Sequence, residues 1–234
     1  MMTYEEFVST VAAGLRKRGP ELEAYVGQIG NFDKVQERIV TRLINLESNR
    51  EFLKDIPHIK IHDLAVVFYL LIRADEDEQM TTVISNTLLE YWRISVKELK
   101  AVAWKNSQKL MPSVFVPLER LFGESLPLYV LSHQHGLYGA VAMLYPGMLK
   151  EAAEEIGSDL VVLPSSVNEV LLLPYEEGIS LHDLRHLVQF VNRTEVPEEE
   201  RLSDNVYVYR QAEDTLEMDG RIVHLGEECI DFAA

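Results

Sequence analysis

The stretch LYVLSHQHGLYGAVAMLYPGMLKEAAEEIGSDLVVLPSSVNEVLLLPYEEGISLHDLRHLVQFVN, residues 128–192, decides the fold. Its first part holds two short runs rich in Tyr, Val and Leu, at 128–132 and 138–145. Between them lies His133-Gln134-His135-Gly136, in which the glycine is able to take the positive φ of a hairpin loop. The pattern therefore predicts a β-hairpin with both histidines exposed at its tip.

The second part of the stretch predicts a helix, another strand pair and a second helix. The helix covers 148–156, and Gly157 follows it as a C-terminal cap would. The strands are expected at 159–163 and 169–173, and each is followed by a proline, which lacks the N–H that a strand ladder needs. Together these elements predict an α+β fold of β-hairpins with covering helices.

The last helix of the stretch begins after Ser180, with Asp183 placed for a capping box. Apolar residues recur at helical spacing along one side of it, and we expect that side to cover a sheet. These residues are Leu181, Leu184, Leu187, Val188 and Val191.

Patterns outside this stretch predict further helices and strands. Helices are expected at 4–18 and 33–46, and Ser95 with Glu98 forms a capping box before a helix that ends near 109. Strands are expected at 62–72 and 80–84, where β-branched and aromatic residues are concentrated. For the continuous apolar run 62–72 a helix is the alternative. The segment between the prolines at 112 and 117 is read as a connection.

The end of the chain adds a strand at 205–210 and a hairpin that turns at Asp219-Gly220. We therefore expect three regions: an N-terminal helical region (1–57), a hairpin with helices (58–125) and a hairpin-and-helix half (126–234). The last two are expected to pack as one unit.

The composition is that of a globular protein with a strong negative charge. The chain has 234 residues, of which 47% are hydrophobic, and its 22 basic and 38 acidic residues give a net charge of −16. Nucleic acids and anionic membranes attract positive surfaces, so neither is expected as a partner. A protein with a basic or mixed surface is a suitable partner. The negative charge also permits a role as an acidic mimic of nucleic acid.

The single cysteine, Cys229, permits neither an intrachain disulfide nor a cysteine metal cluster, which fits a reducing compartment. The N-terminus has no basic segment followed by an apolar core, so no signal peptide is expected. The longest apolar run, about 64–72, is too short to span a bilayer. These features predict a cytoplasmic protein.

Four segments carry a resemblance to a known bacterial family. They are RLINLESNREFLKDIPHIKIHDLAVVFYLL (42–71), ISVKELKAVAWKN (94–106), the strand-helix-hairpin run 128–174, and LSDNVYVYR (202–210). From about 37 to 210 the chain resembles the family "domain of unknown function five-six-eight-eight", seen mainly in clostridial gut bacteria, and more distantly "domain of unknown function one-four-four-four". Neither resemblance implies catalytic residues, a binding site or a cofactor.

Histidines provide the candidate metal ligands. His182 and His186 are separated by one helical turn, as in the H-E-x-x-H helices of zinc enzymes, although Asp183 stands where those helices carry glutamate. A complete site would also need His133 or His135 close by. The alternative is that all four are ordinary solvated histidines.

A second candidate site is a short polar strip along the same helix. Arg185, Gln189 and Arg193 recur at helical spacing on the side expected to face solvent. A small basic strip on a very acidic protein is suited to binding a partner.

These observations leave three functions open. The first is a non-catalytic cytoplasmic protein that binds or regulates a partner, with no cofactor. The second is a metal-dependent hydrolase that uses His182 and His186, and the third is the acidic nucleic-acid mimic. A cluster of three histidines would favour the enzyme, and their dispersal would favour the binding protein.

Overall fold

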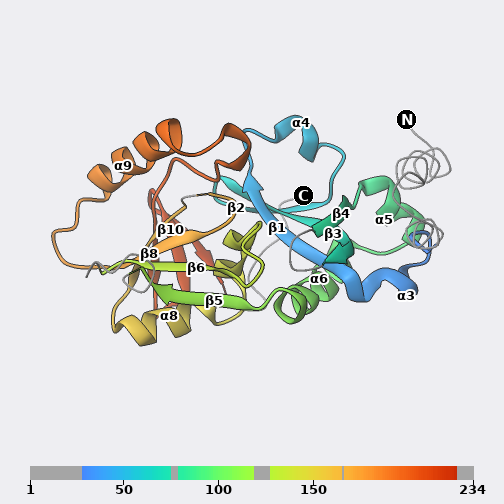
Figure 1. Cartoon of the computed structure of the whole chain (residues 1–234), viewed down its shortest axis with the longest axis horizontal. Helices are drawn as coiled ribbons and strands as arrows, with labels where there is room; N and C mark the ends of the chain where they lie inside the picture. Colours follow the sequence, from blue (N-terminus) through green and yellow to red (C-terminus); the bar gives the residue numbers. More distant parts are fainter. Residues whose placement is uncertain (1–27, 75–78, 119–126, 165, 226–234) are drawn as a thin grey trace. The chain divides into compact units, whose positions relative to one another are not determined.

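The computed structural model describes residues 28–74, 79–118, 127–164 and 166–225 (Figure 1). The helix expected at 4–18, the acidic segment 75–78 and Cys229 lie outside these ranges. Within them, no helix has the length and apolar character needed to cross a membrane.

The contacts between residues group the chain into two compact units with interleaved segments. The three regions expected from the sequence are consecutive, whereas each unit combines separate segments of the chain. Unit 1 comprises Met1–Thr41, Glu51–His58 and Val67–Leu110; unit 2 comprises Arg42–Arg50, Ile59–Val66 and Met111–Ala234.

The first sheet has four strands in the order β1-β3-β2, and β4 also pairs with β3. The pairing of β3 with β4 is antiparallel, from Tyr69 opposite Val83 to Ala74 opposite Gln79, which confirms the expected hairpin. The strands are β1 (Ile39–Asn45), β2 (His58–Ile61), β3 (Leu64–Ala74) and β4 (Gln79–Val83).

Unit 1 contains helices whose ends follow from the sequence. Ser95 and Glu98 form the expected capping box: the Ser95 N–H donates to the Glu98 carboxylate (2.8 Å), and the Glu98 N–H donates to the Ser95 hydroxyl (3.2 Å). Among the described residues, the helices of this unit are α3 (Phe32–Val35), η1 (Gln36–Arg38), α4 (Arg50–Leu53), α5 (Asn86–Trp92) and α6 (Val96–Leu110). Arg50, the first residue of α4, belongs to unit 2.

The helix expected at 33–46 is wrong, because the helical turns end at Arg38 and β1 follows. Ile39, Val40 and Thr41 are β-branched and their side chains are fully or almost fully buried, an environment that favours a strand. The Thr41 N–H donates to the hydroxyl of Ser107 on α6 (2.8 Å). The helix had been expected because Val35, Ile39, Leu43 and Leu46 recur at helical spacing, and that recurrence is coincidental.

Unit 2 is built on a seven-stranded sheet with the order β11-β10-β9-β7-β8-β6-β5. Every neighbouring pair in it is antiparallel. The strands are β5 (Ser113–Pro117), β6 (Tyr129–His133), β7 (Leu160–Leu163), β8 (Val170–Pro174), β9 (Tyr207–Arg210), β10 (Thr215–Met218) and β11 (Arg221–His224).

Most strands of this sheet were expected, including the β10–β11 hairpin, in which Asp219 and Gly220 both have positive φ. The reading of the segment between the two prolines as a connection is wrong, because it forms β5. The strand expected at 138–145 is also wrong: Gly139–Leu144 is a buried 3₁₀ helix, η2. Periodicity does not distinguish a helix from a strand in a continuous apolar run.

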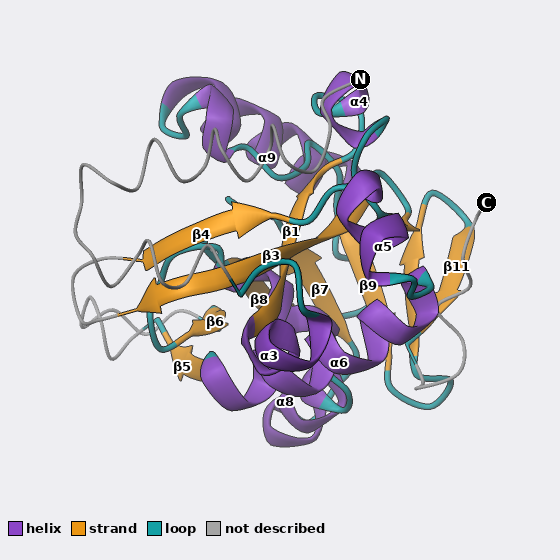
Figure 2. Ribbon diagram, turned by 90° about the vertical axis from the view of Figure 1, so that its right-hand side faces the viewer, coloured by secondary structure: helices purple, strands orange, loops and turns teal. Residues whose placement is uncertain are grey.

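Two helices cover the sheet. Figures 1 and 2 show α8 (Met148–Ile156) and α9 (Leu181–Thr194) on opposite sides of it. Val188 of α9 belongs to a buried cluster with Val161 and Leu163 of β7. A short 3₁₀ helix, η3 (Glu198–Glu200), follows α9. The α+β class is as expected. Because Val188 is buried against β7, the opposite side of α9 faces outward.

Candidate functional site

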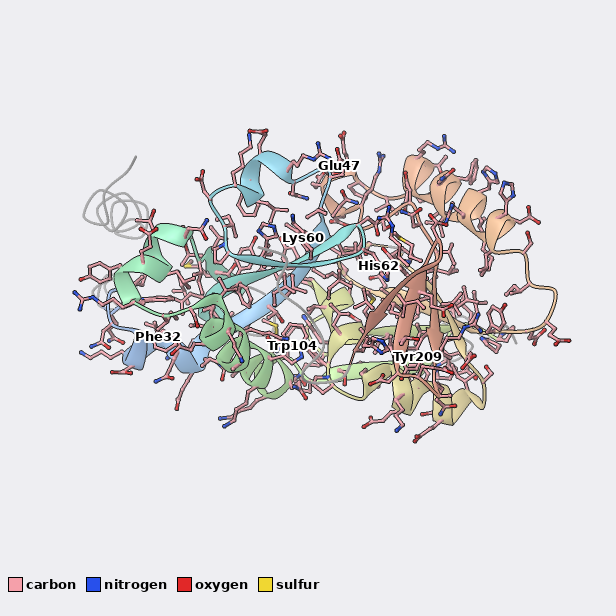
Figure 3. The ribbon with its side chains drawn as sticks, turned by 180° about the vertical axis from the view of Figure 1, so that it is seen from behind. Phe32, Glu47, Lys60, His62, Trp104 and Tyr209 are labelled. Carbon is pink, nitrogen blue, oxygen red and sulfur yellow. The ribbon has the colours of Figure 1, made fainter. Side chains whose placement is uncertain are left out.

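The sequence of α9 fixes where the helix begins and which side is buried. The Asp183 N–H donates to the hydroxyl of Ser180 (3.2 Å), so Ser180 caps the helix as expected. Val188 is buried, and Leu184 packs against the same cluster of strand residues. The opposite side of α9 faces solvent, and Figure 3 shows side chains standing away from the sheet along it.

We define the α9 outer face as the exposed residues His182, His186, Leu187, Phe190 and Arg193. Leu187 is 52% exposed and Phe190 is 60% exposed, and one helical turn separates them. The prediction that Leu187 belongs to the core side is wrong; the same holds for Leu181, which is also exposed. The buried side is narrower than expected, because the half-buried Arg185 and the buried Asn192 share it with Val188.

The two histidines of α9 lie against each other. Their Nε2 atoms are 3.2 Å apart, and the rings stand nearly perpendicular with centres 4.4 Å apart. Nδ1 of His182 lies 3.5 Å from a carboxylate oxygen of Asp183. A hydrogen bond from the Ser180 hydroxyl, followed by one from His182, lowers the pKa of the Asp183 carboxyl. The carboxylate is therefore charged beside the imidazole at neutral pH.

The other two histidines lie elsewhere, and the prediction that both are exposed at a hairpin tip is wrong: His135 is half-buried, no strand follows at 138–145, and His133 is buried. It is the last residue of β6 and only 2% exposed. Burial, then His135 and Arg42, lower the pKa of His133 to about 4, so its imidazole is neutral. Nδ1 of His133 accepts the N–H of His135 (3.3 Å), whereas its buried Nε2 has no hydrogen-bond partner.

The four candidate metal ligands therefore form two pairs. The rings of His133 and His135 have centres 6.0 Å apart. Among the residues that the structure describes, no group of three or more His, Cys, Asp or Glu side chains is arranged to hold a metal ion. In the part of the chain that the structure describes, α9 offers two ligands and nothing there supplies a third.

The expected polar strip is only partly free for a partner. The guanidinium of Arg185 is about one-third exposed and pairs with the carboxylate of Asp219, in the turn between β10 and β11. Arg193 is exposed, and its Nε donates to the backbone carbonyl of Gln189 (2.9 Å). Arg185 therefore links α9 to the sheet, and Arg193 is the member that lies on the outer face.

Acidic residues stand at both ends of the outer face. Glu176 and Glu177 are exposed just before α9, and Glu195, Glu198 and Glu199 are exposed just after it. Exposed carboxylates keep their charge at neutral pH. The two apolar side chains therefore lie between two negative ends, with Arg193 as a local positive charge.

A second polar cluster in unit 2 surrounds Asp63, in the turn after His62 (labelled in Figure 3). Its carboxylate accepts from the hydroxyl of Tyr207 (2.6 Å), the hydroxyl of Ser203 (2.5 Å) and the amide of Asn205 (3.0 Å). Burial, then the charge of Asp63, raise the pKa of Tyr207 well above its usual value. Every member has a partner, so this cluster fixes the loop before β9 and leaves no reactive group.

Sequence reasoning missed the Asp63 cluster, since its members are about 140 residues apart in the chain. It also missed Phe190. The signal for Phe190 was available: at 100° per residue it lies almost opposite Val188, on the side of His186.

The comparisons with known proteins give one match. The model of a family described as "Family of unknown function (DUF5688)" matches residues 1–211. No curated protein and no solved structure matches the chain. The fainter likeness to domain one-four-four-four stays an expectation.

Proposed function

This chain belongs to DUF5688, a family of unknown function, and we propose from its own surface that it is a non-catalytic protein-binding module. The partner docks on the α9 outer face. One observation carries the proposal: Leu187 and Phe190 stay more than half exposed on a helix whose other side is buried against the sheet. Apolar side chains one helical turn apart on the open face of a helix are the anchors of helix-mediated docking.

The charges around this face define the partner's chemistry. Glutamates at both ends of α9 favour a surface whose rim is basic and whose centre is apolar. Opposite charges speed association and are screened by salt, so binding weakens as ionic strength rises. A cytoplasmic location is part of this proposal, and it is suited to a chain with one cysteine.

The apolar pair is large enough to anchor a partner. Docking would remove roughly 200 Å² of apolar surface on Leu187 and Phe190 from water, which corresponds to at most about 5 kcal/mol. Ordering of side chains offsets part of this gain, leaving about 2–3 kcal/mol. Loss of both side chains is therefore expected to weaken binding by about 30- to 150-fold.

A selection of short peptides from a random library on the immobilised protein tests the proposal. The enriched peptides should combine Lys or Arg with Leu, Ile, Phe or Trp. They should bind the Leu187→Ser/Phe190→Ser variant far more weakly than the wild type. The matched control is Leu137→Ser/Ile222→Ser, which removes apolar side chains of similar exposure (49% and 57%) elsewhere in unit 2.

Two results would overturn the proposal. One is equal affinity of the enriched peptides for the wild type and for the Leu187→Ser/Phe190→Ser variant. The other is enrichment of acidic peptides. Circular dichroism checks that the variants are folded, which is expected because both side chains face solvent.

The metal-dependent hydrolase is a second candidate, favoured by the closeness of His182 and His186. Catalytic zinc sites use three protein ligands and one open position. The described residues offer no third ligand beside this pair, so the docking function has the better support.

A further inference from the structure

The two imidazoles on the α9 outer face have the spacing of a metal chelate. We propose that His182 and His186 bind one divalent transition-metal ion of the zinc and copper class through their Nε2 atoms. The site has two protein ligands, and water or a group from outside the chain completes the coordination. It is a binding site and needs neither the proposed docking nor any hydrolytic activity.

The distance between the two nitrogens supports this directly. Zinc binds imidazole nitrogen at about 2.0–2.1 Å. Two nitrogens 3.2 Å apart then subtend an angle of about 100° at the metal, between the octahedral and tetrahedral values. One of the two Nε2 atoms carries the proton of their hydrogen bond, so metal binding requires that imidazole to hold its proton on Nδ1 instead. The rings, which now stand at 83° to each other, must also turn so that both lone pairs face the ion. Both side chains are exposed, so solvent leaves room for this rotation.

Asp183 prepares one of the ligands. Its carboxylate oxygen lies 3.5 Å from Nδ1 of His182, which favours the tautomer with the proton on Nδ1 and leaves the Nε2 lone pair free. A carboxylate behind a ligating imidazole is the usual outer partner in zinc sites. Asp183 is therefore a positioning residue and not a ligand.

The chemistry of the donors selects the class of metal. Neutral imidazole suits zinc, copper and nickel, whereas magnesium and calcium prefer oxygen ligands. With two nitrogens and no enforced geometry, affinity should follow the general order in which Cu²⁺ exceeds both Ni²⁺ and Zn²⁺. Mg²⁺ should not compete.

The test is calorimetric titration of the full chain without a histidine tag, using Zn²⁺ and then Cu²⁺ in excess Mg²⁺. One equivalent should bind, with Cu²⁺ tighter. His182→Ala and His186→Ala should each weaken binding by about tenfold or more. Asp183→Asn should weaken it by a smaller factor. His224→Ala, which removes an exposed histidine on β11, is the matched control and should leave the affinity unchanged.

Nitrogen-detected NMR of the histidine rings gives an independent readout. Of the seven histidines, only two, His182 and His186, should show Zn²⁺-dependent shifts at Nε2. One of the two signals should be absent in His182→Ala and the other in His186→Ala. The proposal is overturned if the wild type binds no Zn²⁺ or Cu²⁺. It is equally overturned if either alanine variant keeps the wild-type affinity, or if His224→Ala loses as much.

Discussion

Acid should destabilise this protein through His133. The unfolded chain binds a proton on this residue near the ordinary histidine pKa of about 6.5, whereas the folded protein binds it only near 4. Between these pH values the unfolded state holds more protons than the folded state. The stability contributed by neutral His133 is therefore complete above about pH 6.5 and is lost as the pH falls toward 4.

The magnitude follows from the two pKa values. The full difference corresponds to about 3 kcal/mol, of which about 1 kcal/mol is lost between pH 7 and pH 5.5. The physical cause is burial of the ring at the end of β6, with Arg42 and His135 nearby. A charged His133 ring would be a buried cation, and its Nε2 would have no hydrogen-bond partner to compensate for the lost water.

Urea unfolding of the wild type and of His133→Gln at pH 7 and pH 5.5 measures this effect. The wild type should lose about 1 kcal/mol more than the variant over this range. His224→Gln, at an exposed position, should behave as the wild type does. If His133→Gln does not fold, an NMR titration of the His133 ring in the wild type replaces it. Equal losses in the wild type and His133→Gln, or a measured His133 pKa above 6, would refute the reasoning.

Three further changes have defined outcomes. Gly139→Ala should lower the free energy of unfolding by about 3 kcal/mol or prevent folding, because its Cβ would stand 2.5 Å from the Asn168 carbonyl oxygen and 2.8 Å from the His133 backbone nitrogen; a thermal midpoint equal to that of the wild type would contradict this. Tyr207→Phe should cost about 2 kcal/mol in urea unfolding, since Asp63 loses a hydroxyl donor at 2.6 Å; no change would mean that the hydroxyl bond is not formed. Ser95→Ala should cost about 1 kcal/mol by removing the α6 cap, and Ser95→Asp should restore most of it; equal stability of the two variants would argue against capping.

The parts of the fold that depend on local rules were predictable. The capping box at Ser95, the N-cap at Ser180, the stop at Gly157 and the Asp219-Gly220 turn each rest on residues within a few positions of one another. The same is true of the histidine pair on α9, whose contact follows from helical spacing alone.

The parts that depend on neighbours distant in the chain were not predictable. β1 comes from a segment whose apolar residues recur at helical spacing, and η2 comes from a continuous apolar run. Tertiary contacts decide the conformation of both. The burial of His133 depends on β6 lying between β5 and β8 in the sheet. The exposure of Leu187 depends on how α9 is rotated against β7. The sequence pattern predicted a wider buried side on this helix than the structure has.

Amide hydrogen exchange tests most directly whether partners dock on α9. The measurement compares the protein alone with the protein saturated by a selected basic and apolar peptide. Docking on α9 should slow exchange at residues 181–194 and leave the β10–β11 hairpin unchanged. Unchanged exchange along α9, with slowed exchange in another part of the chain, would contradict it.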